Sequence, residues 1–193
     1  MSYRLRYVIL TIIVGIGGTG AASFANYAMR GSAVRERAAG EIFPISAAEP
    51  NTRITPGAVD PRVTQANIQQ TICRRGYSKS VRPPESYTEP LKRRVIAEYG
   101  YADRRLGDYE LDHIVSLELG GAPRDPKNLF PQPHNVGGGW GSFAKDRLEN
   151  RLHSLVCRGQ ISLGKAQHDI ATDWISAYKQ FLGPSPRYLL KEH

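Results

Sequence analysis

The stretch that decides the fold is Tyr109-Glu-Leu-Asp-His-Ile-Val-Ser-Leu-Glu-Leu-Gly-Gly121, followed closely by Asp125-Pro-Lys-Asn-Leu-Phe-Pro131. Residues 109–119 have the pattern of a β-strand. Two glycines and two prolines then force a loop, and residues 128–131 predict a short second strand. The sequence therefore predicts one small β hairpin in the middle of the chain.

Helical patterns surround this hairpin on both sides. A short helix is expected over Thr64–Cys73, and a second over Tyr87–Tyr99 with Thr88 as N-cap and Pro90 in its first turn. Another begins near Ser142, and its apolar stripe is formed by Leu148, Leu152, Leu155 and Val156. A last long helix follows Ser162. The predicted fold class is α+β and mainly helical, with a small hairpin-plus-helix motif embedded among helices.

The N-terminus has the order of an export signal. Arg4 and Arg6 precede the apolar residues 7–16, and small residues follow as far as Ala25. We expect residues 1–25 to be a cleaved signal peptide; the alternative is an uncleaved membrane anchor formed by residues 7–25. The expected location is the periplasm or the exterior, or, for the anchored form, the outer side of the membrane.

The rest of the chain divides by composition. Residues 26–55 are expected to be a flexible linker, residues 56–183 the folded domain, and residues 184–193 a C-terminal tail. Two cysteines, Cys73 and Cys157, fall within the domain. In an exported domain they are expected to form a disulfide, with two buried thiols as the alternative. No protein partner can be inferred.

The chain is basic, with a formal net charge of +8 and a sequence pI near 9.7. Such an excess of positive charge favours binding to nucleic acid, and also to an anionic membrane surface. Basic residues before and around the hairpin fit a track of phosphate contacts: Arg74, Arg75, Lys79, Arg82, Arg104, Arg105, Arg124, Lys127 and Lys145. Such contacts give affinity without sequence choice, and an ordinary basic surface is the alternative.

The order Asp112-His113, Gly120-Gly121, Asn128-Leu129 and a helix carrying Lys145-Asp-x-x-Glu149 resembles the HNH, or ββα-metal, endonuclease family of exported bacterial type. The likeness covers roughly residues 109–157. It implies a hydrolase that cleaves nucleic-acid phosphodiester bonds without sequence preference. DNA is the first choice of substrate.

The resemblance assigns a role to each motif residue. His113 is expected to be the general base that activates water, and Asp112 a ligand of one divalent ion, Mg²⁺, Mn²⁺ or Zn²⁺. Asn128 is expected to fix the loop and orient His113. Many family members carry a His or Asn at the helix start as a metal ligand, but this chain does not. Asp146 or Glu149 is the expected replacement, with His134 and His153 as further candidates.

Plainer interpretations exist for the same residues. Asp112 could pair with an arginine, His113 could be a structural histidine, and Asn128 a turn residue. Asp146 and Glu149 could belong to a solvated helix face with neighbouring arginines. The rival function is a catalytically inactive, exported basic module that binds nucleic acid on an HNH scaffold. A membrane-anchored envelope protein unconnected with nucleic acid is a third possibility.

Overall fold

The computed structural model describes residues 43–186, and the expected signal or anchor segment lies outside them. The described part belongs to one unit, Glu36–His193. Its elements are helices α1 (Tyr77–Val81), α2 (Glu85–Glu98), α3 (Ser142–Cys157), α4 (Leu163–Thr172) and α5 (Trp174–Phe181), and strands β1 (Tyr109–His113) and β2 (Leu129–Pro133). This arrangement confirms the expected α+β, mainly helical fold class. No helix among the described residues is long and apolar enough to cross a membrane.

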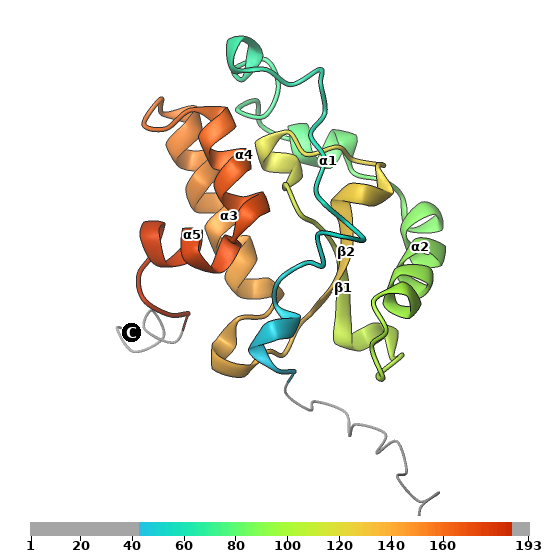
Figure 1. Ribbon diagram of the computed structural model, residues 1–193. Helices are drawn as coiled ribbons and strands as arrows, with labels where there is room; N and C mark the ends of the chain where they lie inside the picture. The colour runs from blue at the N-terminus through green and yellow to red at the C-terminus, as the bar shows by residue number, and fades with distance from the viewer. Residues whose placement is uncertain (1–42, 187–193) are drawn as a thin grey trace, which may run out of the picture. The chain divides into compact units, whose positions relative to one another are not determined.

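The two strands pair in antiparallel fashion, with Asp112 opposite Phe130 and His113 opposite Leu129. The hairpin lies between α2 on one side and the helices α3, α4 and α5 on the other (Figure 1). A small apolar cluster formed by Leu91, Val95 and Leu129 joins α2 to the sheet. The hairpin is therefore held from both sides, and its side chains are fixed by packing.

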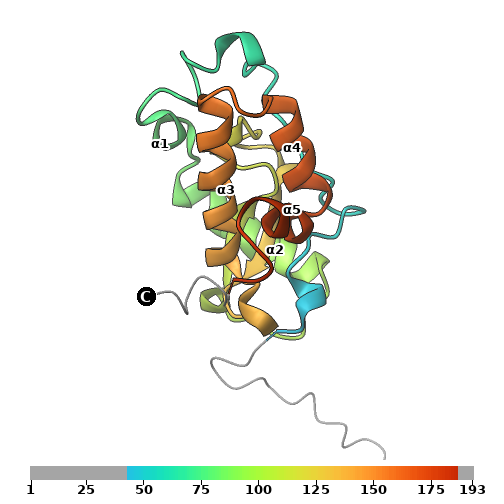
Figure 2. The same cartoon turned by 90° about the vertical axis from the view of Figure 1, so that its left-hand side faces the viewer.

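The larger hydrophobic core lies on the α3 side of the hairpin. Leu148 and Leu152 of α3 are fully buried in it, as the apolar stripe predicted, together with Trp174 of α5. Figure 2 shows α3 running beside α4, with α5 packed across them. The core thus fixes α3 as the rigid element against which the hairpin is placed.

The prediction that residues 26–55 form a flexible linker is wrong for residues 43–55, which are the part that the structure describes. Phe43 and Ala48 are buried in the main core, and the Trp174 indole N–H donates to the Ala48 carbonyl at 3.0 Å. The described part of this segment packs as an irregular strap made of a 3-10 helix (Ile45–Ala47), bends and turns, so it has no regular apolar period. The folded domain therefore begins no later than Phe43.

Several helix boundaries also differ from expectation. α2 begins at Glu85, directly after Pro84, so Thr88 is not its N-cap and Pro90 lies inside it. Residues 64–73 form 3-10 and looser turns, because the Asn67 side chain bonds the backbone of Thr64 and Arg62 in competition with a helix.

The last long helix is interrupted. Asp173 has non-helical backbone angles and separates α4 from α5, and its carboxylate accepts the Ser176 N–H at 2.8 Å as the cap of α5. Periodicity alone could not reveal this break, since the apolar spacing continues through it.

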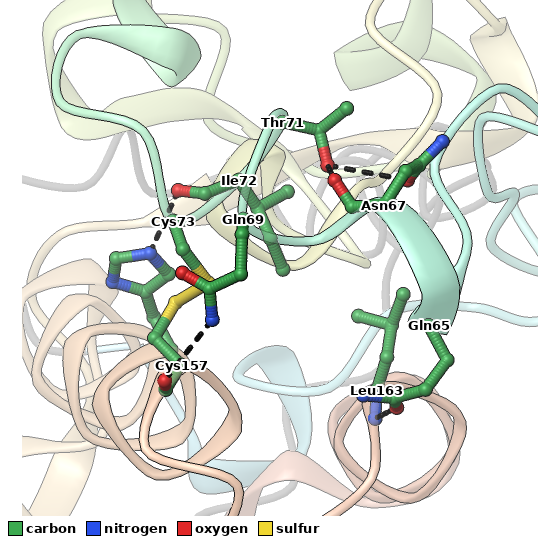
Figure 3. The surroundings of a disulfide bond; sticks show 9 residues. Gln65, Asn67, Gln69, Thr71, Ile72, Cys73, Cys157 and Leu163 are labelled. Atoms are coloured by element: carbon green, nitrogen blue, oxygen red, sulfur yellow. Dashed lines mark hydrogen bonds between the residues drawn. A yellow bond between two sulfur atoms is a disulfide. The ribbon is translucent and has the colours of Figure 1, made fainter.

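The expected disulfide is confirmed. Cys73 and Cys157 are bonded, with their Cα atoms 5.6 Å apart, and they tie the segment before α1 to the C-terminal end of α3 (Figure 3). The neighbouring Gln65 side chain accepts the Leu163 N–H at 2.7 Å, so the same segment is also fastened to the start of α4. The front of the domain is therefore joined covalently to its main helix.

Candidate active site

Asn128 holds the loop of the hairpin. Its side-chain oxygen accepts the N–H groups of Val115 and Ala58 at 2.9 and 3.2 Å, and its amide donates to the carbonyls of Val115 and Ala122 at 3.0 and 3.2 Å. Every hydrogen-bonding position of this fully buried amide is used. Asn128 therefore fixes the loop as expected, but its amide does not bond the His113 ring.

Gly121 explains why the loop needs a glycine. A Cβ atom at this position would lie 1.7 Å from the Val115 carbonyl oxygen and 2.8 Å from the Asn128 amide nitrogen. Only glycine lets the two backbones approach this closely. The Gly-Gly motif and Asn128 therefore act together to close the loop after His113.

His113 is buried at the end of β1, and its Nε2 lies 3.1 Å from the carbonyl oxygen of Pro123. A carbonyl can only accept, so Nε2 carries the proton, and the neutral ring keeps its lone pair on Nδ1. Burial lowers the pKa of His113 below its ordinary value, although the negative charge of Asp112 opposes that shift. The ring is therefore neutral at neutral pH and able to accept a proton.

A cavity of about 360 Å³ lies on this side of the hairpin. His113, His134 and Glu110 line it, together with the cationic Arg82 and Lys92. Glu85 and Glu89 of α2 also line it, so two imidazoles, three carboxyl groups and two cations face one cavity. The sequence had not singled out Glu110 or Lys92, because neither is marked by motif spacing.

His134 is positioned by the start of α3. Its Nδ1 lies 2.8 Å from the Ser142 hydroxyl, and its ring stacks beside Phe143 with the centroids 6.1 Å apart. Phe143 is 72% exposed, which is unusual for a large apolar side chain. The structure thus brings His134, the loop candidate, into the same cavity as His113.

Lys145 is the largest departure from the expected site. Only 1% of its side chain is exposed, so it cannot contact a phosphate backbone, and its assignment to nucleic-acid binding is wrong. Its ammonium donates to Asp112 Oδ2 and to the His113 carbonyl, both at 2.7 Å, and to Glu149. A lysine, and not an arginine, is thus the partner of Asp112.

The metal set expected from Asp112, Asp146 and Glu149 fits only in part. The Lys145 ammonium lies between Asp112 and Glu149. Among residues 43–186, the one group of three potential ligand atoms within 4.8 Å of one another is Cys73, His153 and Cys157. The three carboxylates therefore do not converge on a point as an ion would require.

The carboxyl groups around Lys145 nevertheless favour the binding of a further cation. Burial, together with the negative charges of Asp112 and Asp146, raises the pKa of Glu110 to about 7. Burial and Asp112 also raise the pKa of Asp146, and burial raises that of Glu149 to about 8 against the effect of Lys145. Four carboxyl groups thus lie near one buried ammonium that contacts only Asp112 and Glu149, and such an excess is typical of functional sites.

The remaining predicted residues lie apart from the cavity. The His153 ring Nε2 is 2.9 Å from the Ile72 carbonyl, beside the disulfide. Arg105 is paired with Asp103 and Asp108. Arg104, Arg124 and Lys127 are exposed, so they stay candidates for phosphate contact.

No protein-family model, curated protein or solved structure matches this chain. The geometry of the cavity and its residues therefore indicates the function.

Proposed function

We propose that the protein is an exported, metal-dependent endonuclease that hydrolyses nucleic-acid phosphodiester bonds without sequence preference. The observation that carries the proposal is the placement of His113. A buried, neutral imidazole with its lone pair on Nδ1 lines a cavity that also holds His134 and two cationic side chains. The hairpin β1–β2 followed by helix α3 agrees with the ββα order that the motif resembles.

His113 acts as the general base. Its Nδ1 takes a proton from an attacking water, while the bond from Nε2 to Pro123 keeps the ring in the required tautomer. The Lys145 bond to the His113 carbonyl and the packing of β1 hold the backbone of this residue in place. The lowered pKa keeps the base unprotonated at neutral pH.

A divalent ion would be held in the cavity by Glu110, with His134 as a nitrogen donor and with Asp112 or Asp146 as a carboxylate near Glu110. Oxygen and imidazole donors suit Mg²⁺, Mn²⁺ and Zn²⁺ in different degrees. When bound, the ion would stabilise negative charge on the phosphate and the leaving oxygen. The excess of carboxyl groups over the single Lys145 ammonium supports such an ion.

The rim of the cavity suits a nucleic-acid strand. Arg82 and Lys92 can neutralise phosphates, and the exposed ring of Phe143 offers a face on which a base can stack. None of these contacts reads a base edge, which agrees with cleavage independent of sequence. The disulfide supports an oxidising location outside the cytoplasm.

A plasmid-nicking assay tests the proposal. The purified protein is compared in Mg²⁺, Mn²⁺, Zn²⁺ and EDTA, alongside His113→Ala and the matched control His168→Ala, whose side chain is exposed on α4. We expect metal-dependent cleavage that falls by about 10²–10⁴-fold in the His113 variant alone. Cleavage that survives both EDTA and His113→Ala would refute the proposal.

A second candidate function is the inactive nucleic-acid-binding module. The buried Lys145 favours it, because its ammonium already neutralises part of the acidic cluster where the ion was expected. Salt-dependent DNA binding by folded protein, without cleavage in any of the three metals, would establish this alternative.

A further inference from the structure

A second cluster of chemically active side chains lies at the far end of α3. His153 and Cys157 are four residues apart on this helix, so they share one face. Cys73 reaches them from the segment before α1 (Figure 3). One ligand atom from each of the three residues lies within 4.8 Å of the other two, and all three residues are partly exposed.

We propose that reduction of the Cys73–Cys157 disulfide converts this cluster into a Zn²⁺ site with Cys73, Cys157 and His153 as ligands. Two thiolates and one imidazole are a donor set that suits zinc, and water can fill the fourth position. The site differs from the proposed nuclease centre in its residues and its donors, so it does not depend on that function.

The chemistry balances with an external dithiol as reductant. The dithiol gives two electrons and two protons to the disulfide, whose sulfur–sulfur bond breaks into two thiols, and the dithiol becomes a cyclic disulfide. Zn²⁺ then displaces both thiol protons and forms two zinc–sulfur bonds. In the oxidised protein no thiolate is present, so metal binding requires reduction.

The geometry needs little rearrangement. Around a tetrahedral zinc, two sulfur ligands lie roughly 3.8 Å apart, given zinc–sulfur bonds of about 2.3 Å. The two Cα atoms are 5.6 Å apart, so side-chain rotation can open the sulfurs to this separation. The His153 ring is already held against the cysteine segment by its bond to the carbonyl of Ile72, the residue before Cys73.

The surrounding contacts keep the cluster assembled after reduction. The Gln69 amide lies 3.5 Å from the Cys157 carbonyl, and Gln65 accepts the Leu163 N–H at 2.7 Å (Figure 3). Ile68 and Ile72 are buried in the main core on the same segment. These contacts hold the Cys73 segment against α3 without the covalent bond, which limits the entropy lost when zinc binds.

Cobalt(II) spectroscopy tests the inference. Protein reduced with a phosphine or a dithiol, then freed of reductant under anaerobic conditions, is titrated with Co²⁺ beside oxidised protein and the Cys73→Ser, Cys157→Ser double variant. An ion at the proposed nuclease centre would bind equally in all three samples, so it cannot cause a difference between their spectra. We expect a thiolate-to-cobalt charge-transfer band and tetrahedral d–d bands in the reduced protein alone, saturating at one ion per chain and displaced by Zn²⁺.

The third ligand is tested by His153→Gln, with His168→Gln as the matched control. Loss of His153 should weaken Zn²⁺ affinity of the reduced protein by roughly tenfold or more, whereas the control should leave it unchanged. A melting experiment covers the case in which reduction loosens the fold: Zn²⁺ should raise the melting temperature of the reduced protein but not of the Cys-free variant.

Three results would overturn the inference. Reduced protein that shows no thiolate–cobalt band refutes the site. If wild type and His153→Gln bind zinc with equal affinity, His153 is not a ligand of the site. Reduced protein that stays unfolded in saturating Zn²⁺ shows that the ligands do not assemble. Each result leaves the nicking assay on oxidised protein unaffected, so failure here and failure of the nuclease proposal are distinguishable.

Discussion

Replacing Lys145 with methionine is the sharpest test of how the centre of the domain is held together. Methionine is unbranched and of similar length, so it fills the same space without the charge. The variant removes the one ammonium that Asp112 and Glu149 share, and it leaves the buried His113 carbonyl without its 2.7 Å donor. The outcome therefore measures an electrostatic contribution, with little change in packing.

The expected loss follows from burial. Removing one partner of a buried ion pair costs about 3–5 kcal/mol, because the remaining charge stays out of water. The cost for Glu149 is smaller, because its pKa of about 8 means that it can be protonated, and therefore uncharged, at neutral pH. The orphaned His113 carbonyl adds to it by about 1–3 kcal/mol. We expect a net loss of about 4 kcal/mol, or roughly 10–15 °C in melting temperature for a domain of about 150 residues.

Urea unfolding at neutral pH measures this loss, with Lys165→Met as the matched control. Lys165 pairs with Asp169 at 2.8 Å in the same i,i+4 spacing, but 46% of its side chain is exposed. Exposed pairs of this kind contribute about 0.5 kcal/mol or less. The loss in Lys145→Met should also shrink as the pH falls, because the carboxyl groups freed of their ammonium become neutral.

Two results would refute the reasoning. A Lys145→Met variant within about 1 kcal/mol of wild type would show that the buried ammonium contributes no more than a surface pair. A loss that grows as the pH falls would show that unpaired carboxylates are not its cause.

The remaining predictions concern other parts of the same domain. Asn128→Ala leaves several buried backbone groups unpaired and should cost about 3 kcal/mol in urea unfolding; an unchanged midpoint would contradict the loop argument. Because the pKa of His113 lies below its ordinary 6.5, the cleavage rate should stay level as the pH falls to that value and decline only below it; a decline that starts above pH 7 would exclude His113 as the base. Burial raises the pKa of Glu49 from 4.5 to about 7, so folding takes up a proton and stability falls as the pH rises between these values; Glu49→Gln should remove that slope in melting curves. The Cys73→Ser, Cys157→Ser variant opens a loop of sequence separation 84 and should lose about 2–5 kcal/mol, and no loss would mean that the unfolded chain is not constrained by the bond.

The sequence predicts those parts of the site that depend on local backbone chemistry. The hairpin, the glycine loop and the role of Asn128 in holding it all follow from residues close together in the chain. The disulfide follows from the count of cysteines and the expected compartment. Such features need no knowledge of distant neighbours, so spacing and residue type are enough.

The strap from Phe43 and the role of Lys145 could not be predicted in this way. Phe43 packs against Tyr109, sixty-six positions along the chain, and no periodic pattern links the two. Lys145 lies three and seven residues before Leu148 and Leu152, so it shares their face of α3, and its partners Asp112 and His113 come from β1. A charged residue is normally expected at the surface, so its burial becomes visible only once the partner strand is placed.

Lys145, His153 and Cys157 all lie on α3, and this gives the helix two functions. At its N-terminal end, Lys145 holds the backbone of His113 and the carboxylate of Asp112 in place. At its C-terminal end, Cys157 is fixed to the front segment by the disulfide. Between them Leu148 and Leu152 are fully buried, so the helix cannot shift at one end without disturbing packing that reaches the other. Reduction of the disulfide should therefore lower the stability of the whole domain, while the hydrogen bonds that orient His113 remain as long as the core stays folded.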